Sequence, residues 1–251
     1  MARRIPFTTL AAIVVAASLP ALAAPPRAEI QVGLCGDPQA VVRALDLVPR
    51  ASGYETWLFD DASLALHARG VRLRLRMQGD KPVLTVKIAA QDCRTLPKGA
   101  LPRGEGKCEY DVHGAAMAGA VSLEQRIPLA AAAELIAGKR IVATLLSPAQ
   151  RSYLRDVLRL DPLPPDLRPL GPIAMQVLRT RDGRYDVDQS TLPGGAATLE
   201  ISVKVPLADV TAAQAALDER LAAAHVMQCA DQSGQAAAKL RSLVERTAPK
   251  P

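Results

Sequence analysis

The sequence is poor in aromatic residues and has no strong excess of one charge. Phe, Trp and Tyr make up 3% of the 251 residues, and 31 basic against 25 acidic residues leave a net charge of +6 at pH 7. So few rings provide no platform for stacking bases, and the basic residues are scattered along the chain instead of clustered. We therefore expect no nucleic acid among the partners of this protein.

Common catalytic and metal-binding motifs are missing as well. The chain has no G-x-S-x-G nucleophile motif, no G-x-x-x-x-G-K phosphate-binding loop and no Cys-x-x-Cys pair. These absences argue against a serine hydrolase with a nucleophile elbow, a P-loop nucleotide-binding protein and a zinc-binding domain.

The first 23 residues have the pattern of a signal peptide. Arg3 and Arg4 form a short basic start, an apolar run follows, and the small residues Ala21 and Ala23 fit a leader-peptidase site with cleavage after Ala23. The run is short for a permanent anchor, which is the alternative interpretation. The mature chain, residues 24–251, contains no second apolar run of membrane-spanning length. We therefore expect a single periplasmic or secreted domain without a membrane span.

All four cysteines lie in the mature chain, and an exported protein meets an oxidising compartment in which disulfides form. Cys93 and Cys108 bracket a stretch rich in proline and glycine between two strand-like segments. A disulfide at the base of this loop is the expected first pair, and it would stabilise the fold by about 3 kcal/mol. Cys35 and Cys229 would then form the second pair and tie the C-terminal helical region to the first strand.

Hydrophobic periodicity predicts an α+β fold with mostly antiparallel strands joined by short turns. Helices are expected after Asp37-Pro38, over parts of 128–160, where Ser147-Pro148 caps the segment that follows, and in the C-terminal region at about 209–247, where two helices close the chain. The segment 161–172 is rich in proline and is expected to be a connector. Strands are expected over eight segments, namely 29–34, 54–59, 71–77, 83–89, 107–113, 173–180, 184–189 and 197–205.

Charged side chains recur on one face of these strands, because alternate residues of a strand share a face. In the third segment Arg72, Arg74 and Arg76 lie together and are backed by valine and leucine. The polar positions of the other strands are Glu29, Gln31, Thr85, Lys87, Lys107, Glu109, Asp111, Arg179, Arg181, Glu200, Ser202 and Lys204.

This pattern has three interpretations. The first is an ordinary one-sided sheet with its charges in water, and the second is an unrelated antiparallel sandwich. The third is a closed barrel with a charged lumen and an apolar outer surface that helices cover. A lumen that combines arginine and lysine with separate carboxylates suits phosphate groups and the hard divalent ion that bridges them.

The segment 57–87 closely resembles the CYTH domain, also called the triphosphate tunnel metalloenzyme family. It has a strand end, Trp57-Leu-Phe-Asp60, a leucine-rich turn, the run Gly70-Val-Arg-Leu-Arg-Leu-Arg76, a hairpin, and Leu84-Thr-Val-Lys87. The segments 107–111 and 199–203 are similar to later acidic strands of that family. The resemblance implies one tunnel domain over residues 24–251, built as an eight-stranded antiparallel β-barrel with a charged lumen and a cover of helices.

The resemblance also implies roles for individual residues. Arg74, Arg76 and Lys87 would bind phosphate groups, and Arg179 or Arg181 would add a further contact. The carboxylates of Glu29, Glu109, Asp111 and Glu200 would hold Mg²⁺ or Mn²⁺. Family members hydrolyse triphosphates or cyclise ATP by positioning and charge neutralisation.

Two positions depart from the family pattern on the acidic side. The opening Glu-x-Glu-x-Lys motif reads Glu29-Ile-Gln31-Val-Gly33, and Ser202 stands where a second late glutamate is usual. Because hard metal ions depend on carboxylate charge, these changes should weaken metal binding. We therefore expect a protein that binds a small polyanion, such as tripolyphosphate or a phosphorylated metabolite, with metal-dependent hydrolysis as a further activity. The alternative is a non-catalytic structural or interaction domain of the cell envelope.

Overall fold

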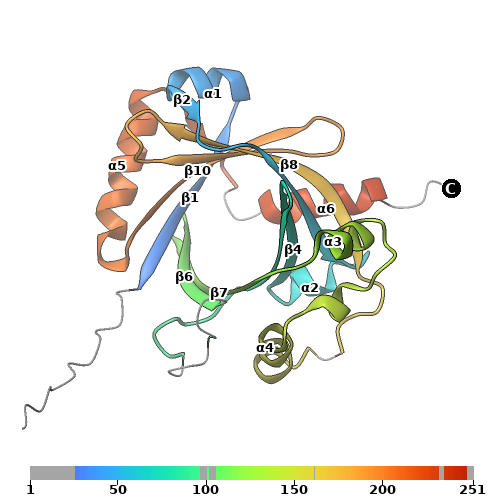
Figure 1. Cartoon of the computed structure of the whole chain (residues 1–251). Helices are drawn as coiled ribbons and strands as arrows, with labels where there is room; N and C mark the ends of the chain where they lie inside the picture. Colours follow the sequence, from blue (N-terminus) through green and yellow to red (C-terminus); the bar gives the residue numbers. More distant parts are fainter. Residues whose placement is uncertain (1–25, 97–100, 102–105, 161, 232–234, 248–251) are drawn as a thin grey trace, which may run out of the picture.

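The computed structural model describes residues 26–96, 101, 106–160, 162–231 and 235–247, and the predicted signal peptide lies outside this part of the chain. Figure 1 shows strands that curve around a common interior, with α5 on one side and α3 and α4 on the other. The barrel strands are β1 (Arg27–Cys35), β3 (Tyr54–Asp60), β4 (Val71–Gln78), β5 (Lys81–Ile88), β6 (Gly106–His113), β7 (Ala116–Arg126), β8 (Arg168–Thr180), β9 (Asp186–Thr191) and β10 (Ala197–Pro206).

Shorter strands and helices complete the fold. The strand β2 (Leu47–Pro49) pairs with β8, and β11 (Met227–Gln228) pairs with the end of β1. The helices are α1 (Pro38–Ala44), α2 (Ala65–Ala68), α3 (Leu129–Ile136), α4 (Pro148–Leu158), α5 (Val210–Ala223) and α6 (Gln235–Thr247), with 3₁₀ turns at Val142–Leu145 and Leu207–Asp209.

Pairing of β10 with β1 closes the sheet into a barrel of mixed strand direction. The strand order around it is β10, β9, β8, β3, β4, β5, β7, β6 and β1. Strands β1 and β6 run parallel, with Glu29 opposite Asp111, whereas the other neighbours in the barrel are antiparallel. The expectation of eight purely antiparallel strands is therefore wrong, although the α+β class and the closed barrel are confirmed.

The additional strand is β7, which pairs with both β5 and β6. Its sequence contains many small residues and lacks a clear alternation of apolar and polar positions, so its periodicity does not predict a strand. A Cβ atom at Gly119 would lie 1.9 Å from the carbonyl oxygen of Gln91, so glycine permits this close backbone approach. Because β7 lies between β5 and β6, the outer edge of β6 is left to pair with β1 in the parallel direction.

The outer face of the barrel is apolar and is packed beneath helices. Leu73 and Leu75 of β4 are fully buried in a cluster that Leu135 of α3 and Leu154 of α4 complete. A second cluster joins Ile30, Val32, Tyr110 and Ile201 to Val41 of α1 and to Leu217 and Leu221 of α5. Burial of these side chains is the main favourable contribution to the fold, at about 1.5–3 kcal/mol for each large side chain.

Two predicted helix starts are confirmed by their caps. The Asp37 carboxylate accepts hydrogen bonds from the backbone N–H groups of Gln39 and Ala40, and Pro38 occupies the first turn of α1. The Ser147 hydroxyl oxygen accepts a hydrogen bond from the Gln150 backbone N–H, and Oε1 of Gln150 accepts one from the Ser147 backbone N–H, which completes a capping box at the start of α4.

The C-terminal helix α6 packs on the other face of the sheet. Leu240 and Leu243 contact a buried cluster that contains Leu58 and Leu170. Leu58 lies opposite Arg74 in the β3–β4 register, so these two residues share the face that is turned away from α3 and α4. Helix α6 therefore covers part of the same sheet face that carries the arginines.

Both predicted disulfides are present. Cys93 bonds to Cys108, and Cys35 bonds to Cys229 across 194 residues of sequence. The second bond joins the end of β1 to the segment that leads into α6. Among the described residues, none of the helices is both long and apolar enough to span a membrane.

Candidate functional site

Three arginines of β4 form a basic row on the sheet face that α3 and α4 do not cover. Arg72, Arg74 and Arg76 are partly buried, whereas the valine and leucines between them are fully buried on the opposite face. The Nε atoms of Arg74 and Arg76 are buried and have no hydrogen-bond partner among the described residues. The Arg76 guanidinium lies 4.8 Å from the centre of the Tyr54 ring, which supports it by a cation–π contact.

The row concentrates positive charge in a place where water solvates it poorly. Burial, together with the charges of Arg76 and Arg72, lowers the pKa of Arg74 to about 10. Arg74 is still protonated at neutral pH, so the protein keeps a cation there whose hydrogen-bonding groups are not all satisfied. An anion placed against this row would supply the missing acceptors.

Lys87 lies on β5 beside the arginine row, directly opposite Arg72 in the β4–β5 register. Its ammonium group is 2.5 Å from Oδ2 of Asp111, and both side chains are largely buried. The structure therefore pairs a residue expected to bind phosphate with one expected to bind a metal ion.

The carboxylates on β1 and β6 are also paired with lysines. Nζ of Lys204, on β10, lies 3.5 Å from Oε2 of Glu29 and 3.4 Å from Oε2 of Glu109. Lys107 lies 3.2 Å from Glu109 as well. Burial alone would raise the pKa of Glu109, but Lys107 and Lys204 lower it below its ordinary value. Glu109 is therefore ionised and held between two cations.

Glu200 lies near a second carboxyl group, that of Asp188, which the sequence did not indicate. It lies opposite Asp188 in the β9–β10 register, and burial and the Asp188 charge raise the pKa of Glu200. The charge of Lys239, on α6, acts in the opposite direction on the Glu200 carboxyl. Asp188 could have been found from the alternation within 184–189, whereas the position of Lys239 depends on how α6 docks.

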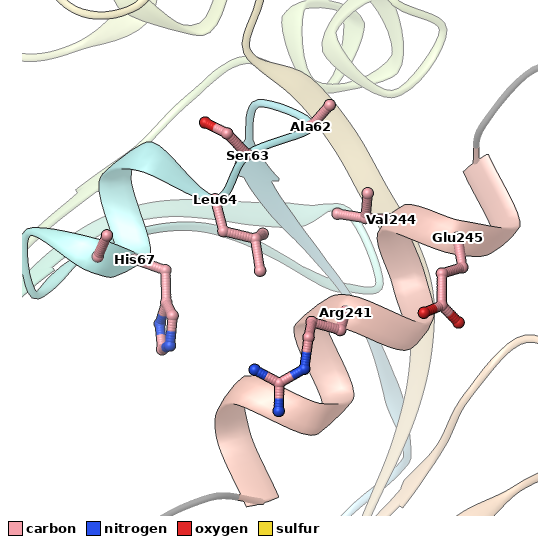
Figure 2. A pocket seen from close by; sticks show the side chains of 8 residues that line it. Ala62, Ser63, Leu64, His67, Arg241, Val244 and Glu245 are labelled. Carbon is pink, nitrogen blue, oxygen red and sulfur yellow. The ribbon is translucent and has the colours of Figure 1, made fainter.

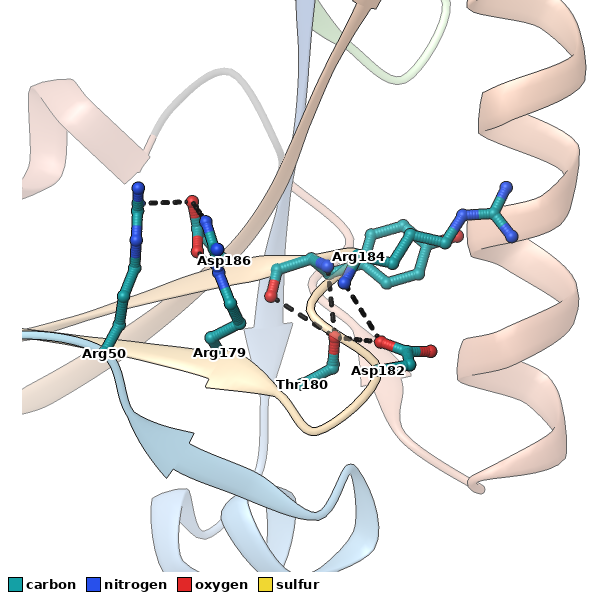
Figure 3. Close-up of polar contacts among 7 residues, drawn as sticks. Arg50, Arg179, Thr180, Asp182, Arg184 and Asp186 are labelled. Carbon is teal, nitrogen blue, oxygen red and sulfur yellow. Dashed lines mark hydrogen bonds and ion pairs between the residues drawn. The ribbon is translucent and has the colours of Figure 1, made fainter.

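Arg179 and Arg181 each have a carboxylate partner within the chain. Arg179 makes two hydrogen bonds to the Asp186 carboxylate, at 2.6 and 3.0 Å, and Arg50 binds the same carboxylate at 2.6 Å. Figure 3 shows this group beside the β8–β9 turn. Arg181 follows β8 on the surface, where its exposed guanidinium forms two hydrogen bonds with Asp46.

The acidic residues as arranged do not fit a divalent ion. Within the described parts of the chain, no group of three or more His, Cys, Asp or Glu side chains is placed to hold a metal ion. Gln31 and Ser202, which lie opposite each other on β1 and β10, provide neutral oxygens where the resemblance would place carboxylates. Mg²⁺ and Mn²⁺ require several oxygen ligands, and here lysine ammonium groups already pair with the carboxylates of Glu29, Glu109 and Asp111.

A surface pocket of about 460 Å³ lies apart from the arginine row, between the α2 region and α6. Figure 2 shows His67 and Arg241 on opposite sides of it. Its lining is formed by Ala62, Ser63, Leu64, His67, Ala68, Arg241, Val244 and Glu245. None of these residues belongs to the predicted site, so the pocket does not contribute to the arrangement described above.

Comparison with known proteins identifies the fold. No protein-family model and no curated protein matches the chain in sequence. Two solved structures align over most of it. HpAC1 from Hippeastrum, described as an adenylyl cyclase candidate with a dominant triphosphatase activity, is 17% identical, with a TM-score of 0.53 over 86% of this chain and 97% of its own. A protein from Bacillus halodurans described as an adenylate cyclase candidate is 13% identical, with a TM-score of 0.54 over 84% of this chain and 97% of its own.

These identities are low, so the comparison bears on the fold and leaves the activity of this chain to its own residues. The expected resemblance is confirmed at that level, since both structures are of the CYTH type. The chain has the fold of the CYTH-like adenylate cyclase and triphosphatase proteins.

Proposed function

We propose that this protein is exported and that it binds a small polyanion, such as tripolyphosphate, inside its barrel. The observation that carries the proposal is the arginine row of β4. Arg74 and Arg76 each keep a buried Nε without a hydrogen-bond partner among the described residues. Phosphate oxygens are good acceptors for such donors, since charge-assisted hydrogen bonds to arginine are short and strong.

The spacing of the row favours an extended anion with several phosphate groups. Alternate residues of a strand are about 7 Å apart, so Arg72 and Arg76 are separated by about 13 Å along β4. A single phosphate would reach only part of this length. The interior face therefore suits a linear triphosphate or polyphosphate, and the triphosphatase activity described for HpAC1 is consistent with such a ligand.

Binding without efficient hydrolysis is the form of the function that this chain supports best. The residues that would position a metal ion are either neutral, as at Gln31 and Ser202, or paired with lysine, as at Glu29, Glu109 and Asp111. Arg74 and Arg76 of β4, in contrast, keep Nε atoms without a hydrogen-bond partner among the described residues. The signal-peptide pattern and the two disulfides support export to an oxidising compartment.

Isothermal titration of the mature, oxidised protein (residues 24–251) with tripolyphosphate tests this proposal. The unmodified protein should bind with a measurable heat, and Arg74→Gln should weaken the affinity by about 10–100-fold, as expected for the loss of charge-assisted hydrogen bonds worth about 1.5–3 kcal/mol. The matched control is Arg140→Gln, because Arg140 is an exposed arginine that pairs with Glu134 on the surface.

Two results would contradict the proposal. Absence of heat with tripolyphosphate would leave a structural or interaction domain as the better description. An equal loss of affinity in the Arg74 and Arg140 variants would show that binding depends on net charge and not on the arginine row. Phosphate release, measured in parallel with Mg²⁺ and then Mn²⁺, should be absent or very slow.

A further inference from the structure

The acidic side of the barrel has its own cation. Lys204 extends from β10 to Glu29 on β1 and Glu109 on β6, with Nζ to carboxylate distances of 3.4–3.5 Å. Burial would lower the pKa of Lys204, but the charges of Glu29 and Glu109 raise it above its ordinary value. Lys204 is therefore a protonated bridge between two carboxylates that come from different strands.

Other lysines lie near the remaining carboxylates of this side. Lys87 is bonded to Asp111. Lys239 is carried by α6, whose leucines pack against Leu58 and Leu170 on the arginine face. The charge of Lys239 lowers the pKa of Glu200, but burial and the Asp188 charge outweigh it and raise that pKa. Three of the four carboxylates expected to hold a metal ion, those of Glu29, Glu109 and Asp111, thus lie within ion-pair distance of a lysine.

A lysine ammonium group and a divalent ion can both neutralise carboxylates, but their chemistry differs. Mg²⁺ requires near-octahedral oxygen coordination, whereas an ammonium group donates three hydrogen bonds and needs no fixed cage. An ion that entered between Glu29 and Glu109 would have to displace Lys204, whose Nζ already lies within ion-pair distance of both carboxylates. A lysine in place of the metal ion is compatible with the neutral residues Gln31 and Ser202, because fewer carboxylates then need to be neutralised.

We infer that Lys204 replaces a divalent ion between Glu29 and Glu109 in this barrel, so that the polyanion binds without any metal. The inference rests on the proposed function and specifies its cofactor requirement. Lys204 neutralises the carboxylates of Glu29 and Glu109, which would otherwise repel the phosphates. The arginine row holds the other side of the ligand.

Two titrations test the inference on the mature, oxidised protein. In the first, tripolyphosphate is titrated in EDTA and then in excess Mg²⁺. Binding should be fully present in EDTA, and Mg²⁺ should not strengthen it. In the second, Mn²⁺ alone is titrated and followed by electron paramagnetic resonance. The unmodified protein should bind Mn²⁺ at least tenfold more weakly than Lys204→Met, in which Glu29 and Glu109 lose their shared cation.

Variants separate the role of Lys204 from general charge and folding effects. Lys204→Met should lose at least tenfold in affinity for tripolyphosphate in EDTA, and Lys204→Arg should retain most of it. Lys139→Met, at an exposed position, is the matched control and should change neither titration. Circular dichroism should show the same fold for all variants.

The outcomes distinguish the inference from the proposed function. Binding of tripolyphosphate only when Mg²⁺ is present would overturn the inference and leave the proposed function intact. Binding of Mn²⁺ by the unmodified protein as tight as by Lys204→Met would also overturn the inference, whatever the phosphate titration gives. No heat with tripolyphosphate in either buffer would overturn the proposed function and the inference together.

Discussion

The barrel carries two groups of charged residues that differ in how their charges are balanced. On β4, Arg74 and Arg76 have buried donor atoms without a hydrogen-bond partner among the described residues. On β1 and β6, Glu29, Glu109 and Asp111 each contact a lysine. Unbalanced charge costs folding free energy and persists where a ligand compensates it, whereas balanced charge is already satisfied within the chain. The comparison therefore supports the proposal that the arginine row is the recognition element.

The largest expected effect on stability comes from removing a cation on the balanced side. Lys87→Met leaves the largely buried Asp111 carboxylate without its partner at 2.5 Å, so we expect the free energy of unfolding to fall by about 2 kcal/mol. Urea denaturation monitored by circular dichroism measures this change. The double variant Lys87→Met/Asp111→Asn should recover most of the loss, and a single variant as stable as the unmodified protein would show that the pair is not a folding element.

The Asp61 carboxylate, which is balanced by hydrogen bonds and not by a lysine, provides a reference for the stability effect of Lys87→Met. Asp61 accepts hydrogen bonds from the backbone N–H groups of Ser63 and Ala65 and from the Ser63 hydroxyl, at 2.7–3.0 Å. Asp61→Ala should lower the free energy of unfolding by about 1.5 kcal/mol at pH 7, as for the loss of a helix cap. Asp61→Asn keeps the acceptor oxygen and should lose less.

The Asp61 contribution should also depend on pH. Burial alone would raise the pKa of Asp61, but the hydrogen bonds from Ser63 and Ala65 lower it below the ordinary value. A carboxyl with a lowered pKa in the folded state contributes stability above its unfolded-state pKa of about 3.9, and this stability disappears as the pH falls through the folded-state value. The difference between the unmodified protein and Asp61→Ala should therefore shrink below pH 4. A difference that is constant from pH 7 to pH 3 would contradict this account.

A smaller change in the free energy of unfolding, of opposite sign, is expected in the arginine row of β4. Arg74→Gln removes a partly buried cation that lies between Arg72 and Arg76, so we expect the ligand-free protein to gain about 1 kcal/mol in free energy of unfolding. Urea denaturation without phosphate in the buffer measures it. A loss of stability would show that Arg74 has an internal structural role, and the contrast between the two groups of charges would then fail.

The smallest effect is expected at Arg181. Its guanidinium is exposed and forms two hydrogen bonds with Asp46. Arg181→Gln should therefore change the Kd for tripolyphosphate by less than about twofold, since exposed ion pairs contribute little. Isothermal titration of Arg181→Gln and Arg74→Gln with tripolyphosphate, side by side, measures the difference in Kd. A tenfold loss would place Arg181 in the binding site and extend the recognition element beyond β4.

Local patterns in the sequence predict much of the fold. The alternation of Val71–Gln78 is regular, so it identifies both a strand and a face that carries three arginines. The caps at Asp37 and Ser147 mark helix starts through short-range hydrogen bonds, which depend only on neighbouring residues. The Cys93–Cys108 bond is predicted by the position of these two cysteines around one loop. In each of these cases the determining interaction is local, whereas the Cys35–Cys229 bond joins distant segments and is expected only because these two cysteines remain.

Features that depend on long-range packing could not be predicted in this way. Strand β7 has small residues where a strand would normally show alternation, so its insertion between β5 and β6, and the parallel pairing of β1 with β6, became visible only in the structure. Lys204 was identified as sharing a face with Glu200, but its bridge between Glu29 and Glu109 requires closure of the barrel. The position of Lys239 requires the docking of α6.

The most direct test of the account is a crystal structure of the mature, oxidised protein with tripolyphosphate, grown in the presence of EDTA. The account predicts phosphate oxygens bonded to the Arg74 and Arg76 guanidinium groups, with Lys204 still between Glu29 and Glu109. A polyphosphate bound elsewhere on the surface, or an interior that contains no ligand at saturating tripolyphosphate, would contradict the central claim that the arginine row is the recognition element of this barrel.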